Sequence, residues 1–235
     1  MSETSPTKQN DADPLSNIPD ELREAAKAAP DHWLGLVDPG WRSEGPPPRW
    51  TVAGEYRSSP EGEVVEWRDN EEYRPSPLAL GWPQPTDPVD LAIQLASTGW
   101  GPPEDVPRQL AGTVVGIWLA ADGTPLRTRT PDGTPVVPVF TSGDQMEAAG
   151  QFATNTIPVE ELAGQLTGDE QLYLNPFGVV AMLVAPEAVL TAANDRGDGE
   201  DGEDGGEGEG RDEGEGAGEA PQPPGTSSDA SPITA

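Results

Sequence analysis

The chain has 235 residues, with 42 acidic and 13 basic side chains, a formal net charge of −29 and no cysteine. This composition excludes disulfides, thiolate metal sites and cysteine nucleophiles. It also argues against nucleic acid and anionic membranes as partners, because both require clustered Lys and Arg. No window approaches the ~20 apolar residues of a membrane span, and the first residues lack the order of a signal peptide. We therefore expect a cytoplasmic protein without membrane insertion, nucleic-acid partner or cofactor.

The first part of the chain predicts little regular structure. Residues 1–30 read as a disordered polar arm that ends in a short helix, with Pro19 at its first position and Pro30 closing it. Residues 32–49 are rich in Trp, Pro and Gly, which predicts an ordered arm that wraps the body without forming a regular element.

A hairpin and a helix follow. The β-rich runs 50–57 and 62–68 are separated by a Ser-Ser-Pro-Glu-Gly stretch, which favours a hairpin with a longer loop. Residues 69–86 are again irregular. A helix is predicted at 87–98, with Asp87 as its cap, Pro88 as its first residue and Gly99 at its end.

The second half predicts more strands. Residues 113–120, 124–130 and 134–140 read as a three-stranded meander, because two Asp-Gly turns separate them. Two helices, a second hairpin and a final helical turn follow, at 143–152, 158–166, 170–184 and 186–193. In that hairpin Asn175, Pro176, Phe177 and Gly178 fit a type I turn at each position.

These elements predict an α+β fold with one mixed or antiparallel sheet of five to seven strands. The helices at 87–98, 143–152 and 158–166 are expected to pack on it. The organisation that follows is an N-terminal arm at 1–30, an α+β domain at 31–193 and a tail at 194–235. The tail holds 13 acidic and 2 basic residues and almost no apolar ones, so we expect it to be disordered.

The turn from Thr141 to Asp144 lies where enzymes often place a nucleophile or a phosphate loop. It has one Gly and no Lys, and Ser142 lacks the flanking glycines of a nucleophile elbow. A helix cap explains the same residues more simply, with Ser142 or Thr141 as the cap and Asp144 at the positive end of the helix dipole.

Other reactive groups are sparse. His32, the only histidine, follows Asp31 in an irregular arm, which favours a structural or exposed residue over a general base. Glu66, Asp69, Glu71 and Glu72 could hold Mg²⁺ or Ca²⁺ or serve hydrolysis, but a solvated hairpin edge accounts for them better. We therefore predict no catalytic, cofactor-binding or metal-binding residue.

Aromatic residues point to protein partners instead. Six of the seven Trp lie in the first hundred residues, and Trp is favoured both in cores and at binding surfaces. The candidates for protein interaction are Trp33, Trp41, Trp82, Trp100 and Phe177.

Two motifs carry a resemblance. "PVVPVFTSGDQMEAAGQF", followed by "IPVEELAGQL" and "LYLNPFGVVAMLV", resembles the N-terminal domain of SseB-type proteins, named for enhanced serine sensitivity, over about residues 114–190. In that family a strand ending in Pro-Val-Phe-Thr-Ser leads into a helix, and a Leu-Asn-Pro-Phe-Gly turn joins two strands.

A second resemblance covers roughly residues 31–190. "WLGLVDPGW", "EWRDNEEYRPSPLALGWPQPTDPVDLAIQLASTGWGPPEDV" and "RTPDGTPVVPVFTS" are similar to actinobacterial proteins described as type VII secretion system-associated. That family has no assigned catalytic residues. The resemblance implies a non-enzymatic accessory protein that binds secretion components or their substrates, at the inner face of the membrane through its partners.

Two alternatives stay open. One is a metal-assisted hydrolase that uses the acidic cluster from Glu66 to Glu72. The other is a charged structural protein that acts through its acidic tail.

Overall fold

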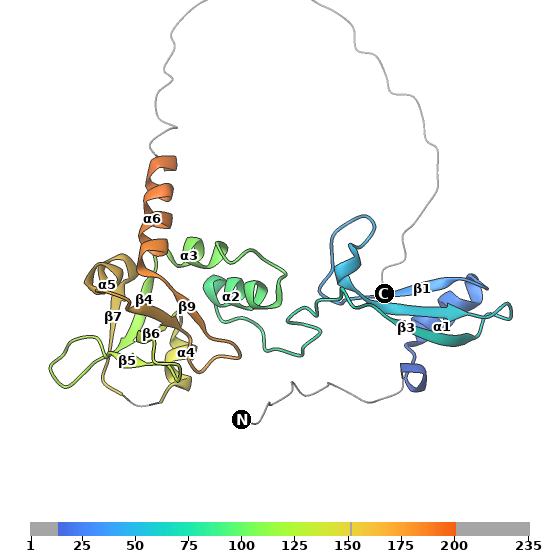
Figure 1. Cartoon of the computed structure of the whole chain (residues 1–235), viewed down its shortest axis with the longest axis horizontal. Helices are drawn as coiled ribbons and strands as arrows, with labels where there is room; N and C mark the ends of the chain where they lie inside the picture. Colours follow the sequence, from blue (N-terminus) through green and yellow to red (C-terminus); the bar gives the residue numbers. More distant parts are fainter. Residues whose placement is uncertain (1–13, 151, 201–235) are drawn as a thin grey trace, which may run out of the picture.

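The computed structural model describes residues 14–150 and 152–200, apart from the side chains of 197–200. Its strands form two sheets, of three and six strands, which stand at opposite ends of the molecule (Figure 1). Helices α2 (Pro88–Thr98) and α3 (Asp105–Leu110) lie between them. The α+β class is thus confirmed, but the early strands build a sheet of their own and do not join the main one.

The small lobe contains α1 (Asp20–Ala28), β1 (Trp33–Val37), β2 (Val52–Ser58) and β3 (Val64–Asp69), with short 3-10 turns at Pro14–Ser16 and Arg49–Thr51. Its sheet is antiparallel, in the order β1-β2-β3. Tyr56 is buried and its ring lies 4.5 Å from that of Trp67. Gly54 makes this possible, because a Cβ there would come within 2.4 Å of the Trp67 ring.

Strand β1 corrects the prediction that residues 32–49 would form no regular element. The Pro and Gly residues that suggested an irregular arm lie mostly after Val37, so they end the strand and do not interrupt it. Ser58 ties the strand to α1, since its Oγ donates to Ala29 O at 2.6 Å and accepts from His32 N at 2.9 Å.

The main sheet has the order β7-β4-β6-β8-β9, with β5 paired to β6 outside this path. Strands β6 and β8 run parallel and all other pairs are antiparallel. The strands are β4 (Val114–Trp118), β5 (Thr128–Arg129), β6 (Pro135–Phe140), β7 (Thr154–Pro158), β8 (Gln171–Leu174) and β9 (Met182–Val184).

Helices cover one face of this sheet. Alternate residues of β4, β6 and β8, such as Ile117, Val139 and Leu172, meet α2, α3, α5 (Val159–Gln165) and α6 (Pro186–Glu200) in one buried apolar cluster. The apolar cluster on the opposite face of the sheet is smaller. There Trp118 and Phe140 pack with Ala149 and with Met146 of α4 (Gly143–Ala148).

The main sheet departs from the predicted meander. Strand β4 pairs directly with β6 at Gly116↔Phe140 and Ile117↔Val139, and the middle segment pairs only with their ends. Strand β7 was not predicted, because its exposed Thr-Asn-Thr sequence has no apolar alternation.

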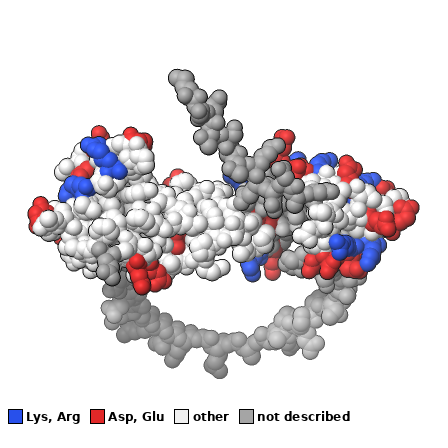
Figure 2. Space-filling model, turned by 90° about the horizontal axis from the view of Figure 1, so that it is seen from below, with Lys and Arg blue, Asp and Glu red and all other residues white. Residues whose placement is uncertain are grey.

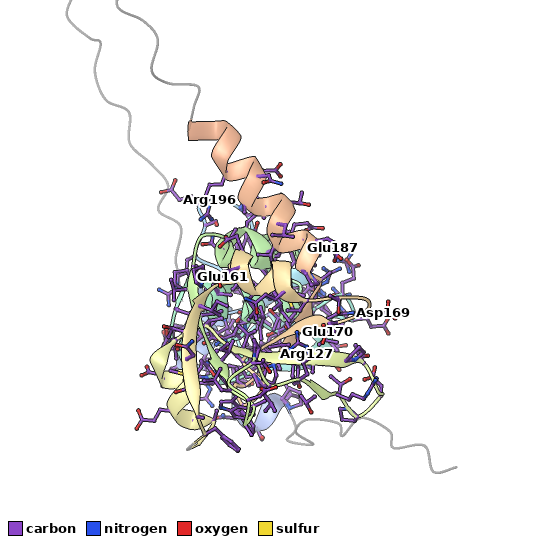
Figure 3. All side chains as sticks on the ribbon, turned by 90° about the vertical axis from the view of Figure 1, so that its left-hand side faces the viewer. Arg127, Glu161, Asp169, Glu170, Glu187 and Arg196 are labelled. Carbon is purple, nitrogen blue, oxygen red and sulfur yellow. The ribbon has the colours of Figure 1, made fainter. Side chains whose placement is uncertain are left out.

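Helix α6 is longer than predicted, since it continues to Glu200 where a disordered tail was expected from residue 194 (Figure 3). The Arg196 guanidinium explains the extension, because it donates to Ala111 O at 2.6 Å and to Arg108 O at the end of α3. The rest of the predicted tail and residues 1–13 lie outside the described residues. Disorder was predicted for residues 1–17, but Pro14–Ser16 form a 3-10 turn. Among the described helices none is long and apolar enough to cross a membrane.

Candidate functional site

A shallow apolar hollow of about 250 Å³ lies where the two lobes meet. We call it the junction groove and define it by the residues that dominate its lining: Leu78, Trp82, Pro83, Leu91, Leu95 and Trp100. These residues come from the linker after β3 and from the outer face of α2. Leu78 and Leu91 are each 44% exposed, which is unusual for adjoining large apolar side chains.

Local sequence signals place the α2 wall of the groove. Asp87 caps the helix by accepting from Val89 N at 2.8 Å and Asp90 N at 2.9 Å, and Pro88 follows as its first residue, as predicted. Gly99 ends the helix in the left-handed region with φ of 73°, also as predicted. The chain reversal at Gly99 brings Trp100 back beside the helix, where the backbone N–H of Trp100 donates to Leu95 O.

Trp100 also joins the lobes. Its ring meets Trp50 edge to face, with 4.9 Å between centroids, and its Nε1 donates to Arg74 O at 2.9 Å. Such a pair contributes about 0.5–1.5 kcal/mol beyond its buried area. The Trp50 carbonyl in turn accepts from Arg74 N. The groove is therefore built on a fixed aromatic contact.

The buried carboxylate of Asp38 holds the opposite rim. Its Oδ2 accepts from the Tyr73 hydroxyl at 2.7 Å and from Ser76 N at 3.0 Å, and its Oδ1 accepts from Gly40 N at 2.7 Å. Burial and this hydrogen bond to Asp38 raise the pKa of Tyr73 well above its ordinary value. Gly40 and Ser76 both line the groove, so one carboxylate positions two of its walls.

Within the described part of the chain, the only charged side chain in the lining of the groove is an arginine, and the Asp38 carboxylate behind its rim is buried. Figure 2 shows charged residues gathered toward the two ends of the visible face, with a nearly uncharged surface between them. Arg42 is the one charged side chain in the lining of the groove. Arg74 lies outside the lining, at the end of α2, because a Cβ at Gly99 would be 3.4 Å from its Nη1. Among the described residues neither side chain has an ion pair, whereas Arg49, Arg57 and Arg68 are all paired.

Of the predicted interaction residues, Trp82 and Trp100 line the groove. Trp41 is half-buried beside it, directly after the Asp38–Gly40 turn. Trp33 lies elsewhere, on β1, where Arg68 stands 4.4 Å and Arg57 5.7 Å from its ring centre. The structure thus brings two of the five into one site and leaves Trp33 covered by two cations.

Phe177 marks a second apolar surface, in the turn between β8 and β9 of the main sheet. It is 56% exposed, Phe152 is 58% exposed, and both rings flank Trp118, at 5.7 and 4.4 Å between centroids. No hollow accompanies this surface. We therefore treat the junction groove as the candidate site.

The helix-cap reading of the 141–144 turn is confirmed. Ser142 Oγ accepts from Gln145 N at 3.3 Å and donates to Thr86 Oγ1 at 3.0 Å. His32 is exposed, with its Nδ1 2.6 Å from Pro30 O, and Asp31 pairs with Arg57. No described residue places a general base beside Ser142.

Asp69, Glu71 and Glu72 line a second surface hollow of about 600 Å³, together with Arg49 and Arg68, but they do not form a metal site. Asp69 accepts from Trp67 Nε1 at 2.7 Å, Glu72 lies 3.4 Å from Arg49, and Glu66 is exposed on β3. Within residues 14–150 and 152–196 no three His, Asp or Glu side chains are grouped to hold a metal ion. The geometry therefore gives the hydrolase alternative no support.

The two motifs of the sequence resemblance meet in space. Because β6 and β8 are parallel, Thr141 and Asn175 follow them at the same sheet edge. Asn175 Oδ1 accepts from Thr141 N at 3.0 Å, Asn175 Nδ2 donates to Thr141 Oγ1 at 2.9 Å, and Thr141 Oγ1 donates to Asp87 Oδ2 at 2.6 Å. Gly178 N donates to Asn175 O at 2.9 Å, which confirms the predicted turn.

Comparison with known families supports this reading. Residues 104–191 match the SseB protein N-terminal domain. This segment is therefore similar to an SseB N-terminal domain, over 88 of the 235 residues. The match begins ten residues before the region of resemblance and so includes α3, while α2 and the groove lie outside it. Neither the curated proteins nor the solved structures yielded a match to the chain.

Sequence reasoning missed Asp38, Tyr73 and Asp90. The Asp-Pro-Gly order at 38–40 is a signal for a side-chain-stabilised turn and could have identified Asp38. Asp90 had no such signal. It is buried, its Oδ2 accepts from Thr86 N at 2.9 Å, and its Oδ1 has no hydrogen-bond partner among the described residues.

Proposed function

We propose that the protein is a non-enzymatic accessory component that binds other proteins through the junction groove. One observation carries the proposal: a cluster of partly exposed Trp, Leu and Pro side chains on a fixed aromatic contact, with a single charged residue in its lining. Exposed apolar surfaces of this kind, anchored by Trp, are characteristic of protein interfaces.

The setting of this role is secretion. The SseB-like domain is the part of the chain that a family match supports, and the resemblance of residues 31–190 to type VII secretion-associated proteins includes every residue of the groove. We therefore propose components or substrates of a type VII secretion system as partners, held at the inner face of the membrane.

The test is affinity capture of the tagged full chain from its native host, with quantitative mass spectrometry of what is retained. The groove variant is Leu91→Glu, which places a charge on a residue that is 44% exposed. The matched control is Val65→Glu on β3, because Val65 is 52% exposed and lies outside the groove. Both changes are at the surface, so both variants should fold.

We expect secretion components to be enriched by the unaltered chain and by Val65→Glu, and lost with Leu91→Glu. Recovery of the same components by Leu91→Glu would remove the groove from the proposal. Recovery of no secretion component by any variant would remove the secretion role.

A further inference from the structure

The junction groove has two features that define the chemistry of its occupant. Its walls present the rings of Trp82 and Trp100 together with Pro83 and Pro85. Flat aromatic and proline surfaces of this type accept extended polyproline segments, whose conformation costs little entropy to fix. The unpaired Arg42 in the lining, with the unpaired Arg74 next to Gly99 at the end of α2, favours a segment preceded by negative charge.

The chain itself contains such a segment. Residues 201–235, outside the described part, hold ten acidic residues and one Arg, and the acidic stretch leads directly into Glu219-Ala220-Pro221-Gln222-Pro223-Pro224. We infer that residues 219–224 occupy the junction groove of the same chain, with the prolines against the two Trp rings and the preceding acids near Arg42 and Arg74. This inference rests on the proposed function, since it makes the tail a competitor for the partner's site.

The chain that connects α6 to the proline segment has a long reach. Twenty residues separate Glu200, where α6 ends, from Pro221. A Gly-rich linker of that length has a root-mean-square span of about 25 Å and a fully extended reach of about 70 Å. Tethering also raises the local concentration of the segment to the millimolar range, so a weak proline–aromatic contact is populated.

The charge balance points the same way. The chain carries 42 acidic residues, and most described arginines are already paired with them. Four described arginines have no acidic partner: Arg129 and Arg196 donate to backbone carbonyls, whereas Arg42 and Arg74, near the groove, have no side-chain partner among the described residues. An acidic segment that arrives at the groove would pair with both.

The absence of cysteine allows a direct test on the full chain. A single Ala220→Cys substitution accepts one nitroxide label, and the indole N–H signals of the seven Trp report its proximity by paramagnetic broadening. We expect Trp82 and Trp100 to lose most of their peak height, while Trp33 and Trp67 in the small lobe keep theirs. A label at Gly206→Cys, in the acidic stretch, controls for non-specific approach of the tail.

A second variant separates proline recognition from charge. In the labelled chain, replacing Pro221, Pro223 and Pro224 by Ala should restore the Trp82 and Trp100 signals. Equal broadening of all Trp signals, no broadening, or broadening that survives the three Ala substitutions would overturn the inference. A mixture of labelled chain with isotope-enriched unlabelled chain must show no broadening; a loss of signal there would assign the groove to a second copy's tail and overturn it too.

The outcome does not depend on partner capture. If the tail fails to reach the groove but Leu91→Glu still abolishes capture, the proposed function stands alone. If the tail occupies the groove but no secretion component is captured, only the inference stands.

Discussion

The hydroxyl of Tyr73 donates to the buried carboxylate of Asp38 across a sequence separation of 35 residues, with 2.7 Å between the oxygens. The contact closes the rim of the junction groove and connects the turn after β1 to the linker after β3. It therefore couples the stability of the small lobe to the shape of the site.

Tyr73→Phe should lower the free energy of unfolding by about 1–3 kcal/mol, because it removes a donor from a buried charged acceptor. Since the pKa of Tyr73 is raised on folding above its ordinary 10.0, its contribution is complete below pH 10 and is lost as the pH rises further. Denaturant titrations at neutral pH and above pH 10 check both statements. The difference between the variant and the unaltered chain should shrink at the higher pH.

Tyr173→Phe is the matched control for this experiment. Tyr173 is half-buried on β8, and its hydroxyl has no hydrogen-bond partner among the described residues. Its removal should change stability little at either pH. An equal loss for both variants would mean that the Asp38 contact contributes nothing specific.

Asn175→Ala should destabilise the SseB-like domain by about 1–3 kcal/mol or more, because it leaves the backbone N–H of Thr141 without its acceptor. The backbone adds to the effect, since Asn175 has φ of 45°, a region that Asn tolerates and Ala does not. Asn155→Ala on the exposed strand β7 serves as control. Thermal unfolding monitored by circular dichroism would distinguish the two, and equal melting temperatures would contradict the importance of the network.

Glu170→Gln should weaken the protein at neutral pH. Its carboxylate accepts from Thr167 N at 2.9 Å and pairs with Arg127 at 2.8 Å, and Figure 3 shows the two side chains side by side. The hydrogen bond from Thr167 N and the Arg127 charge lower the pKa of Glu170 below its usual 4.5. Its contribution is therefore present above that value and is lost as the pH falls through the lowered pKa.

Urea titrations from pH 7 to pH 3 should show the Glu170→Gln difference shrinking toward acid. Glu161→Gln is the control, because Glu161 is exposed on α5 and makes only a 3.5 Å contact with Gln165. A gap that widens toward acid would reverse the assigned direction of the pKa shift.

Arg196→Ala should loosen the end of α6, because its guanidinium supplies the two bonds that hold this helix to the end of α3. We expect faster amide hydrogen exchange over the last two turns of α6, with little change in the global unfolding free energy. Arg108→Ala is a suitable comparison, since it removes an exposed arginine but keeps the carbonyl that Arg196 contacts. Identical exchange in both variants would show that the contact does not order the helix.

Local sequence signals predicted the elements that local chemistry determines. The cap at Asp87, the stop at Gly99 and the turn at Asn175 each follow from one residue type in one backbone setting. The direct pairing of β4 with β6 could not be predicted in this way, because it depends on how the segment between them folds aside. The separate sheet of the small lobe was missed for a similar reason, since strand composition does not specify which strands pair.

The groove was predicted only in part. Trp82 and Trp100 were candidates by residue type, but their meeting depends on Asp38 and Tyr73, whose partners are distant in sequence. The unpaired state of Arg42 and Arg74 could be recognised only once the pairs of the other arginines were known. Long-range polar contacts carry no periodicity, so sequence patterns do not report them.

Helix α2 has a practical consequence for anyone expressing part of this chain. It lies upstream of the SseB match, yet Val89, Ala92 and Ile93 belong to the apolar cluster that the domain's sheet buries, and Asp87 accepts from Thr141. A recombinant fragment that starts at residue 104 would expose that surface to water and should aggregate. One that starts just before Thr86 would keep the missing wall and should stay monodisperse.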